Sequence, residues 1–502
     1  KLMAAWNDMK QHQYQALSYA QAKDLDTYRD YDYSADPAAG AAYYDYNRQT
    51  FRDWSVLSEI TWRISPDSSL VVKPFYLNEE GYYLEGQTTG KVRQWLIDHA
   101  WYGLATEYRT RVADTGLKFG YWGESTEPPG PPTAWKMYNP TAAGDLSGFA
   151  SWAILSKVTE RHRFDSLYAM ADRQFGRLKV RGGLRYLKET MPSIDAYNTA
   201  GVGDVSYDAA LAQSSGVVAD KSVDSFAMTA WLPYLGLGYD LTPAVELKAS
   251  LGRNYGAPSF DVWPVYQANA AKFLAKGLTA EDLWREMKPE TSEALDLGLR
   301  VNRGNAWVEP TVYLARFHDK KVSYDPDGAG TLPAYSQNIG ETRAWGAQLV
   351  GGWSPSAGLN LFGGLSWNRN EFTENLPVEG AADLAVKGEQ IPDVPVWQAN
   401  LGLTWRAGAF SVTPLVRYTG ARWGDTEHSQ RISGYTTVDL SLDYQTRLPI
   451  GKLGAQLAVV NLFDRDYIGV IRADYYQLLS GGSAIYYPGA PRTLVAKVSL
   501  DF

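Results

Sequence analysis

The sequence has no cysteine and no long apolar run. Cysteine is absent from all 502 residues, which excludes disulfide frameworks, zinc–thiolate sites and cysteine nucleophiles. No run of about 18 apolar residues occurs, so no helical membrane span is predicted. The net charge of −8 argues against nucleic acid as a partner, because phosphate contacts require clustered lysine and arginine. Aromatic residues make up 13% of the chain, too many for disorder, so a large all-β protein remains, either soluble or an outer-membrane barrel.

Segments of about ten residues alternate between apolar and polar side chains, which is the periodicity of β-strands. In a membrane barrel the apolar face contacts lipid and the polar face lines the lumen. The alternation assigns the following side chains: Val438, Leu440, Leu442, Leu295, Leu297, Leu494 and Val498 to lipid, and Asp439, Asp443, Arg300, Lys179 and Lys497 to the lumen.

The connections between these segments distinguish a barrel from a soluble sandwich. Short turns, such as 65–69, 241–244 and 448–451, alternate with long excursions, such as 258–288 and 470–487. Outer-membrane barrels pair short periplasmic turns with long extracellular loops. The final strand also alternates up to the terminal Phe502. We therefore predict one antiparallel transmembrane β-barrel domain over residues 1–502, with about 18 strands, the first of them near residues 9–20. Aromatic residues near strand ends suit interfacial girdles, namely Trp353, Trp367, Trp397, Trp405 and Trp423.

From about residue 227 onward, an ordered series of motifs resembles the TonB-dependent outer-membrane receptors. The series includes Lys-Pro-Glu-Thr-Ser-Glu at 288–293, Ile-Pro-Asp-Val-Pro at 391–395, Val-Asn-Leu-Phe-Asp at 460–464 and Pro-Gly-Ala-Pro-Arg at 488–492. Taken residue by residue, Asn461 and Asp464 look structural first, because such side chains satisfy local backbone groups where a strand ends.

This resemblance implies a barrel of about 22 strands closed by an N-terminal plug, so we expect that the plug and the first strands precede Lys1 in the natural protein. It also implies a receptor of the Gram-negative outer membrane, without enzymatic activity or cofactor. Such a receptor imports a scarce large nutrient, most often a ferric siderophore or similar chelate. Its other partners would be TonB, reached through the missing plug, and outer-membrane lipid. The alternative is an 18-stranded substrate-specific passive porin, and a barrel enzyme or adhesin is a third class.

Aromatic residues in the predicted outer loops are the candidates for ligand contact, because exposed apolar area in a loop needs a use. Packing between the loops explains them equally well. These residues are Trp135, Tyr138, Trp263, Tyr266, Tyr475, Tyr476, Tyr486 and Tyr487. The loop segment 268–287 reads as short helices, with Thr279 as an N-cap.

Two other groups of residues have side chains that could serve a function. Charged side chains expected in the lumen either solvate it or guide a solute, and they are Lys179, Arg181, Arg185 and Arg300. The five histidines are dispersed without the spacing of metal ligands, so no metal site is predicted.

Overall fold

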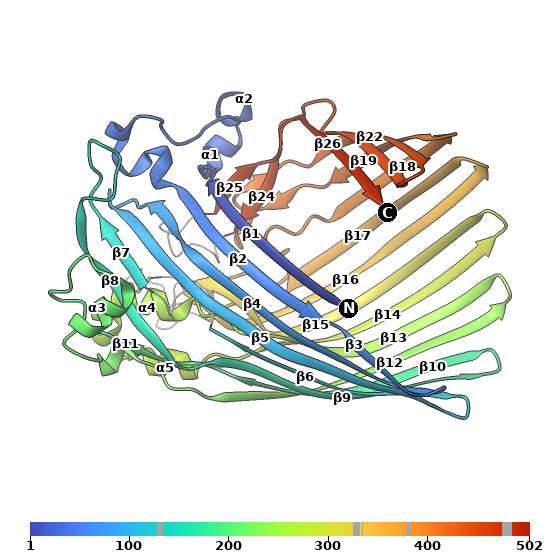
Figure 1. The fold of residues 1–502 in the computed structure, drawn as a ribbon, viewed down its shortest axis with the longest axis horizontal. Coiled ribbons are helices and arrows are strands. Elements are labelled where there is room, and N and C mark those ends of the chain that lie inside the picture. The colour runs from blue at the N-terminus through green and yellow to red at the C-terminus, as the bar shows by residue number, and fades with distance from the viewer. Residues whose placement is uncertain (128–133, 325–331, 334, 378–381, 474–483, 502) are drawn as a thin grey trace.

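The computed structural model is a tilted, curved wall of antiparallel strands with loops and helices gathered at one end (Figure 1). It describes residues 1–127, 134–324, 332–333, 335–377, 382–473 and 484–501. The wall strands are β1 (Leu2–His12), β2 (Arg48–Ser58), β3 (Ile60–Ser65), β4 (Ser68–Gly86), β5 (Val92–Val112), β6 (Thr115–Thr126), β9 (His162–Phe175), β10 (Leu178–Thr190), β12 (Ala227–Thr242), β13 (Val245–Gly256), β14 (Glu290–Arg303), β15 (Ala306–Tyr324), β16 (Tyr335–Ser356), β17 (Leu359–Phe372), β18 (Trp397–Ala407), β19 (Phe410–Thr419), β22 (Tyr435–Leu448), β23 (Gly451–Val460) and β26 (Thr493–Asp501).

The remaining elements lie in the connections at the loop end. The strands there are β7 (Ala134–Tyr138), β8 (Phe149–Glu160), β11 (Ser193–Ala196), β20 (Arg422–Trp423), β21 (Arg431–Ile432), β24 (Ile468–Arg472) and β25 (Ile485–Pro488). The helices are α1 (Tyr19–Ala22), α2 (Leu25–Tyr28), α3 (Tyr207–Gln213), α4 (Val262–Leu274) and α5 (Ala280–Arg285), with 3-10 turns η1 (Pro37–Ala42), η2 (Tyr44–Tyr46) and η3 (Ala219–Lys221). Among the described residues, no helix is both long and apolar enough to cross a membrane.

The strand count agrees with the sequence. Counting β2 and β3 as one strand and setting aside β7, β8 and β11, the 22 strands of the described sheet make 18 wall strands. This confirms the predicted all-β antiparallel barrel architecture. The predicted first strand at 9–20 is wrong in its bounds: β1 ends at His12, and Ser18 caps α1 through the backbone N–H of Gln21. A capping side chain at that position favours a helix start over a continued strand.

Tight turns join the wall strands at the end of the barrel opposite the loops, which we call the turn end. The connections at Pro66–Asp67, Gly304–Asn305 and Gly408–Ala409 each contain two residues. Gly304 and Gly408 both have φ of 60°. Two-residue hairpin turns that match the strand twist require positive φ, which glycine adopts without strain.

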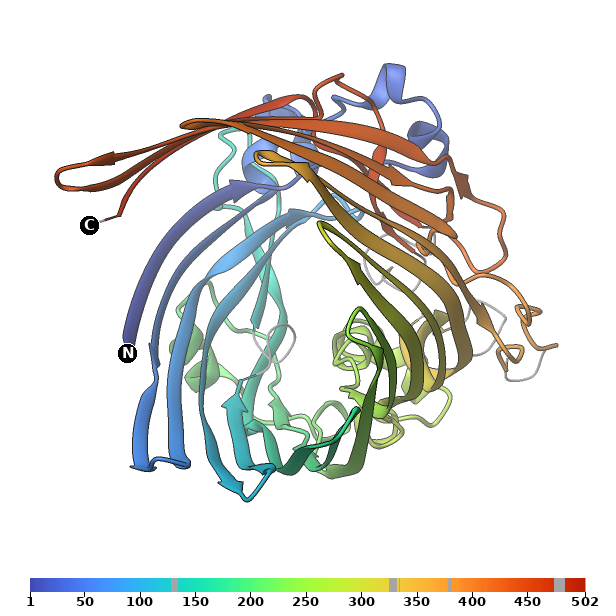
Figure 2. The same cartoon turned by 90° about the vertical axis from the view of Figure 1, so that its right-hand side faces the viewer.

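The two edges of the wall are open. Within the described residues, β1 pairs with β2 alone and β26 pairs with β23 alone. Figure 2, which looks along the barrel, shows the strand at the N-terminus and the final hairpin on either side of this opening. Wall strands that are neighbours in the chain pair with one another everywhere else.

Strand register separates the side chains into two continuous faces. On one face, Leu440 lies opposite Val459 and Pro414, and Leu297 lies opposite Val312 and Ala249. We call this apolar side the outer face. On the polar side, which we call the inner face, Asp443 lies opposite both Gln456 and Ser411. The seven side chains assigned to lipid by the alternation lie on the outer face, and the five assigned to the lumen lie on the inner face.

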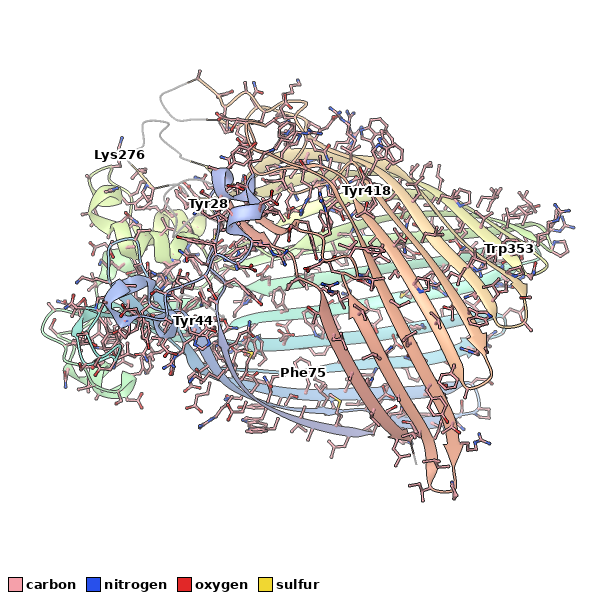
Figure 3. The ribbon with its side chains drawn as sticks, turned by 90° about the horizontal axis from the view of Figure 1, so that it is seen from above. Tyr28, Tyr44, Phe75, Lys276, Trp353 and Tyr418 are labelled. Carbon is pink, nitrogen blue, oxygen red and sulfur yellow. The ribbon has the colours of Figure 1, made fainter. Side chains whose placement is uncertain are left out.

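Aromatic residues border the outer face at both ends. Toward the loops, the ring centroids of Trp345 and Trp367 are 4.8 Å apart and Trp397 follows at 6.5 Å. Toward the turns lie Trp353, labelled in Figure 3, and Trp405. Trp345 and Trp353 are eight residues apart on β16, which corresponds to about 27 Å along the strand. Because the strands of such barrels are tilted by about 35–45°, this separation corresponds to about 19–22 Å along the membrane normal, which is near the roughly 25 Å height of the apolar band of an outer-membrane barrel.

Trp423 does not belong to these girdles. It lies on β20 in a loop, where its ring stacks on His428 at a centroid distance of 4.5 Å. The expectation for Trp423 is therefore wrong, because the strand that would carry it, β19, ends at Thr419.

Leu440 provides the first test of the fold, because it lies midway between the two girdles on β22. We expect Leu440→Arg to lower the free energy of unfolding of the full-length protein by about 2–4 kcal/mol, the cost of arginine near the middle of the bilayer. Chemical denaturation from lipid vesicles measures this value. The neighbouring Ser441→Arg is the control: its side chain lies on the inner face, so we expect a small change. A large loss for Ser441→Arg with none for Leu440→Arg would mean that the two faces are reversed.

Candidate functional site at the loop end of the barrel

Four aromatic rings form a row across neighbouring strands near the loop end. Phe51 on β2, Tyr83 on β4, Trp95 on β5 and Trp135 on β7 follow one another with centroid distances of 4.8, 5.2 and 6.0 Å. Tyr83 lies directly opposite Trp95, which lies directly opposite Trp135. Alternation along β5 puts Trp95 on the same face as Glu107, which accepts a hydrogen bond from Tyr168 on the inner face. We call this inner-facing row the aromatic ladder.

Arg93 supplies a buried positive charge beside the ladder. Its guanidinium carbon lies 4.2 Å from the ring centroid of Trp135 and 5.7 Å from that of Trp95. The same side chain forms an ion pair with Glu85 and is only 5% exposed. A guanidinium held over aromatic faces gains cation–π attraction that strengthens where water is excluded. The ladder and Arg93 together offer flat apolar faces next to a cation, which suits a ligand that combines aromatic groups with negative charge.

A helical module packs against the end of the ladder. α4 and α5 contribute Trp263, Tyr266 and Trp284 to a core shared with β8 and β11, and Trp135 packs against this core. Thr279 caps α5 through the backbone N–H of Asp282, which confirms the predicted N-cap. α4 begins at Val262, earlier than the predicted helical segment. Burial raises the pKa of the Tyr266 hydroxyl, with smaller contributions from Asp220 and Asp282. The module thus has its own apolar core, which fixes its position at the loop end of the barrel.

The predicted ligand residues in this region differ in accessibility. Trp263 and Tyr266 are 1% and 0% exposed, so they build the module, whereas Trp135 is half-buried beside Arg93. Tyr138 is buried, and its hydroxyl oxygen lies 3.2 Å from both Asp204 Oδ1 and Gln94 Oε1, either of which can accept its single proton. Burial and the neighbouring Asp204 raise the pKa of Tyr138. Of these four residues, Trp135 is the one that belongs to the aromatic ladder and keeps an accessible surface.

The other predicted ligand residues lie on or near β25. Tyr486 is fully buried, and its backbone exchanges hydrogen bonds with Leu17 at 2.8 and 3.0 Å. Tyr487 is half-buried, with the Arg472 guanidinium 5.6 Å from its ring centroid. Burial raises the pKa of Tyr487, and the Glu85 carboxylate adds to the increase. Tyr475 and Tyr476 lie outside the described residues.

The four cationic residues expected in the lumen share the inner face. Lys179 forms ion pairs with Asp240 at 3.0 Å and Glu246 at 2.8 Å. The Arg185 guanidinium lies 5.4 Å from the ring centroid of Tyr168. Two further cations lie opposite carboxylates in the register, Arg181 opposite Asp172 and Arg300 opposite Glu246. The inner face is thus a surface of paired charges that favours water or a polar occupant.

The motif residues Asn461 and Asp464 act on the backbone. The Asn461 amide donates to the carbonyl oxygens of Arg465 and Ala490, at 2.9 and 3.0 Å. Asp464 accepts a hydrogen bond from the backbone N–H of Arg492, and this bond contributes most to lowering its pKa. Both residues have positive φ, 52° and 54°. These contacts fix the turn between β23 and the final loop.

Sequence reasoning missed most of the ladder. Phe51, Tyr83, Trp95 and Arg93 lie in strand segments, but their contacts depend on the exact register between neighbouring strands, which alternation alone does not give. The signal that could have identified them is the alternation of side chains, because each lies an even number of residues from an inner-face residue on its own strand. Extending that alternation to the loop end of each strand assigns all four residues to the inner face.

Three comparisons place the chain among known proteins. The family model described as "TonB dependent receptor-like, beta-barrel" matches residues 5–462. The ferrichrome outer membrane transporter/phage receptor of Escherichia coli is 31% identical over 154 residues, 29% of this chain and 18% of that protein. The catecholate siderophore receptor Fiu of E. coli is 22% identical over 351 residues, 68% of this chain and 41% of that receptor. The chain thus spans less than half the length of these two relatives.

Solved structures share the fold. The ferric citrate transporter FecA in its unliganded form aligns with a TM-score of 0.63 at 17% identity, covering 100% of this chain and 67% of FecA. The ferric yersiniabactin uptake receptor FyuA of Yersinia pestis aligns with a TM-score of 0.66 at 16% identity, with the same coverage. An antiparallel barrel with two aromatic girdles, matched along most of its length by the family model, is a protein of the Gram-negative outer membrane. The chain belongs to the TonB-dependent receptor family and forms its β-barrel part.

Proposed function

We propose that the whole protein imports a ferric siderophore or a similar chelate across the outer membrane, with energy supplied through TonB. The observation that carries this proposal is the aromatic ladder with Arg93 at the mouth of a polar-walled barrel. Two of the relatives are named for ferrichrome and for catecholate siderophores. Receptors and transporters of this family act by binding and translocation, so no covalent chemistry is required of the chain.

Binding would occur at the loop end. The ligand would lie against Tyr83 and Trp95, with Arg93 on one side and the helical module on another. Large flat aromatic surfaces bind with little loss of conformational entropy, and a neighbouring cation adds selectivity for an anionic chelate. The loop residues predicted from sequence would then act mainly by holding this surface in place.

Alanine substitutions in the ladder test this binding surface. We expect Trp95→Ala to weaken the affinity of the full-length protein for its ferric chelate about 5- to 10-fold, the loss of one aromatic contact worth about 1 kcal/mol. Isothermal titration against ferrichrome, ferric citrate and a ferric catecholate measures the affinity. Trp353→Ala, which removes the same side chain from the girdle at the turn end, should leave it unchanged. Equal affinity of wild type and Trp95→Ala for every chelate that binds would contradict the assignment.

We further propose that sequence upstream of Lys1 in the natural protein supplies a plug and the strands that complete the ring. The support is the pair of open edges, because an unpaired backbone group in hydrocarbon costs several kcal/mol. β1 and β26 would then pair with strands from that upstream segment rather than with each other. The rival is an 18-stranded porin in which β1 and β26 pair directly.

Cysteine cross-linking separates these two arrangements, and no residue of this chain forms a competing thiol. Asn7→Cys combined with Asp53→Cys should form a disulfide, because these residues are direct partners in the β1–β2 register. Asn7→Cys combined with Lys497→Cys or Ser499→Cys should form none in the full-length protein. Gel mobility with and without reductant reports the bond. A disulfide between β1 and β26 would overturn the upstream closure and favour the porin.

A further inference from the structure

An uncharged surface covers the inner face of three neighbouring strands. Gln348 on β16, Ser366 on β17 and Gln398 on β18 lie in one register row. The row continues to Lys248, which forms an ion pair with Glu309 on the inner face. Alternation from this row assigns the other inner-face residues of each strand. All of them are uncharged over three described segments, 344–352, 360–368 and 398–404. We call this surface the uncharged stripe, and its polar side chains are Gln348, Asn360, Ser366, Asn368, Gln398, Asn400 and Thr404.

The uncharged stripe extends from one aromatic girdle to the other. On β17, Asn368 adjoins Trp367 of the girdle at the loop end. Asn360 lies eight residues nearer the turn end, which corresponds to about 27 Å along the strand. Its neighbour Leu361 is opposite Trp353 of the girdle at the turn end. Figure 1 shows β16 and β17 side by side between the two ends of the barrel. The stripe therefore crosses the full thickness of the membrane.

Two aromatic rings from β15 lie against glycine residues of the stripe. The Tyr313 hydroxyl donates to Asn368 Oδ1 at 2.7 Å, and Gly346 lies between these two residues in the register. Trp307 lies opposite Gly352. A Cβ atom at Gly346 would be 2.6 Å from the Tyr313 hydroxyl oxygen, and one at Gly352 would be 2.6 Å from Trp307 Nε1. Glycine is therefore needed at both positions, because only a residue without a side chain leaves room for the ring beside the wall. This side of the lumen thus presents aromatic surface close to the backbone, between amide and hydroxyl groups.

Ion pairs border the uncharged stripe on both sides. On β13 and β15, Lys248 Nζ lies 2.8 Å from Glu309 Oε1. On β19 and β22, Arg417 pairs with Asp439. The ion pairs of Lys179 lie farther along the inner face, on β10, β12 and β13. We call the inner face of β10 and β12–β14 the charged sector. The lumen is thus lined by charges on one side and by neutral polar groups on another.

The two linings differ in how strongly they would hold a polar solute. Hydrogen bonds to charged groups are roughly twice as strong as those between neutral groups. Passage through a pore requires contacts that are favourable enough to admit the solute but weak enough to release it at each step. A solute with polar or charged groups would therefore move more readily along the uncharged stripe than along the charged sector. The charged sector suits a part that stays in place, such as the plug proposed above.

We propose that the chelate crosses the lumen along the uncharged stripe. The amide and hydroxyl groups of Gln398, Ser366 and Gln348 exchange hydrogen bonds with it in turn, and the exposed ring of Trp307 contacts it near the turn end. This inference rests on the proposed function and adds the route that import takes through the barrel. The aromatic ladder supplies binding at the loop end, whereas the uncharged stripe governs the rate of passage.

The same substitution on the two linings tests the route. Ser366 on the stripe and Ser250 in the charged sector are both half-buried, and the Ser250 hydroxyl donates to Asp296 at 2.8 Å. We expect Ser366→Lys to slow uptake about fivefold or more, because it replaces a neutral contact by a charged one, with unchanged affinity at the loop end. Ser250→Lys should change uptake less than twofold, since its ammonium lies beside Asp296. Gln348→Glu, which keeps the side-chain size, should slow uptake as Ser366→Lys does.

Uptake is measured with the full-length protein in energised cells, and affinity with the same cells after de-energisation. The probes are radiolabelled ferrichrome, ferric citrate and a ferric catecholate, and the rate is normalised to the amount of assembled barrel. Slowing by Ser250→Lys alone, equal slowing by both lysine variants, or normal uptake by both Ser366→Lys and Gln348→Glu would overturn the route. Failure of the proposed function looks different: wild type would then take up the probe equally with and without TonB.

Thiol labelling provides a second readout, because this chain contains no cysteine that would compete. Ser366→Cys should react several-fold faster with a membrane-impermeant maleimide during TonB-driven uptake than in cells without TonB, since passage opens the space beside the stripe. Ser250→Cys should react at the same rate in both. Acceleration at Ser250→Cys alone, at both positions, or at neither would contradict a route along the uncharged stripe.

Discussion

Every backbone N–H and C=O group in the hydrocarbon of a membrane must find a partner within the protein, and the rest of this structure follows from that constraint. The chain meets it with 18 wall strands, each paired with its neighbours except at the two outermost edges. Pairing fixes the register, and the register gives one apolar and one polar face, because side chains alternate along each strand. The girdles and the ion pairs of Lys179 are both consequences of which face a residue occupies.

The two ends of the barrel use this wall differently. Two-residue turns with positive φ keep the turn end short. At the loop end, the strands continue past the membrane and carry β7, β8 and β11, on which α4 and α5 pack. The aromatic ladder belongs to this extension, because Trp135 of β7 continues the row begun on β2, β4 and β5. A rigid wall thereby positions the aromatic ladder at the loop end of the polar lumen.

The sequence predicted the wall well because its signals are local. Alternation of Leu440 with Asp439, and turns such as Gly304–Asn305, can be read without knowing which strand lies beside which. The first strand was misplaced because the residues around Ser18 alternate weakly and the capping role of Ser18 went unrecognised. The site was largely beyond sequence reasoning: Phe51 and Trp135 are brought together by register, and Trp263 is buried by a loop that packs on itself. Exposure of a loop aromatic residue depends on that packing, which composition does not reveal.

Energy-coupled import by the whole protein can be measured by following radiolabelled ferric chelate into cells that express the full-length protein under iron limitation, with and without TonB. We expect chelate to bind to both strains, but to accumulate inside cells only where TonB is present and the inner membrane is energised. Equal accumulation in the two strains, down the concentration gradient and unaffected by a protonophore, would contradict energy-coupled import and identify a passive pore.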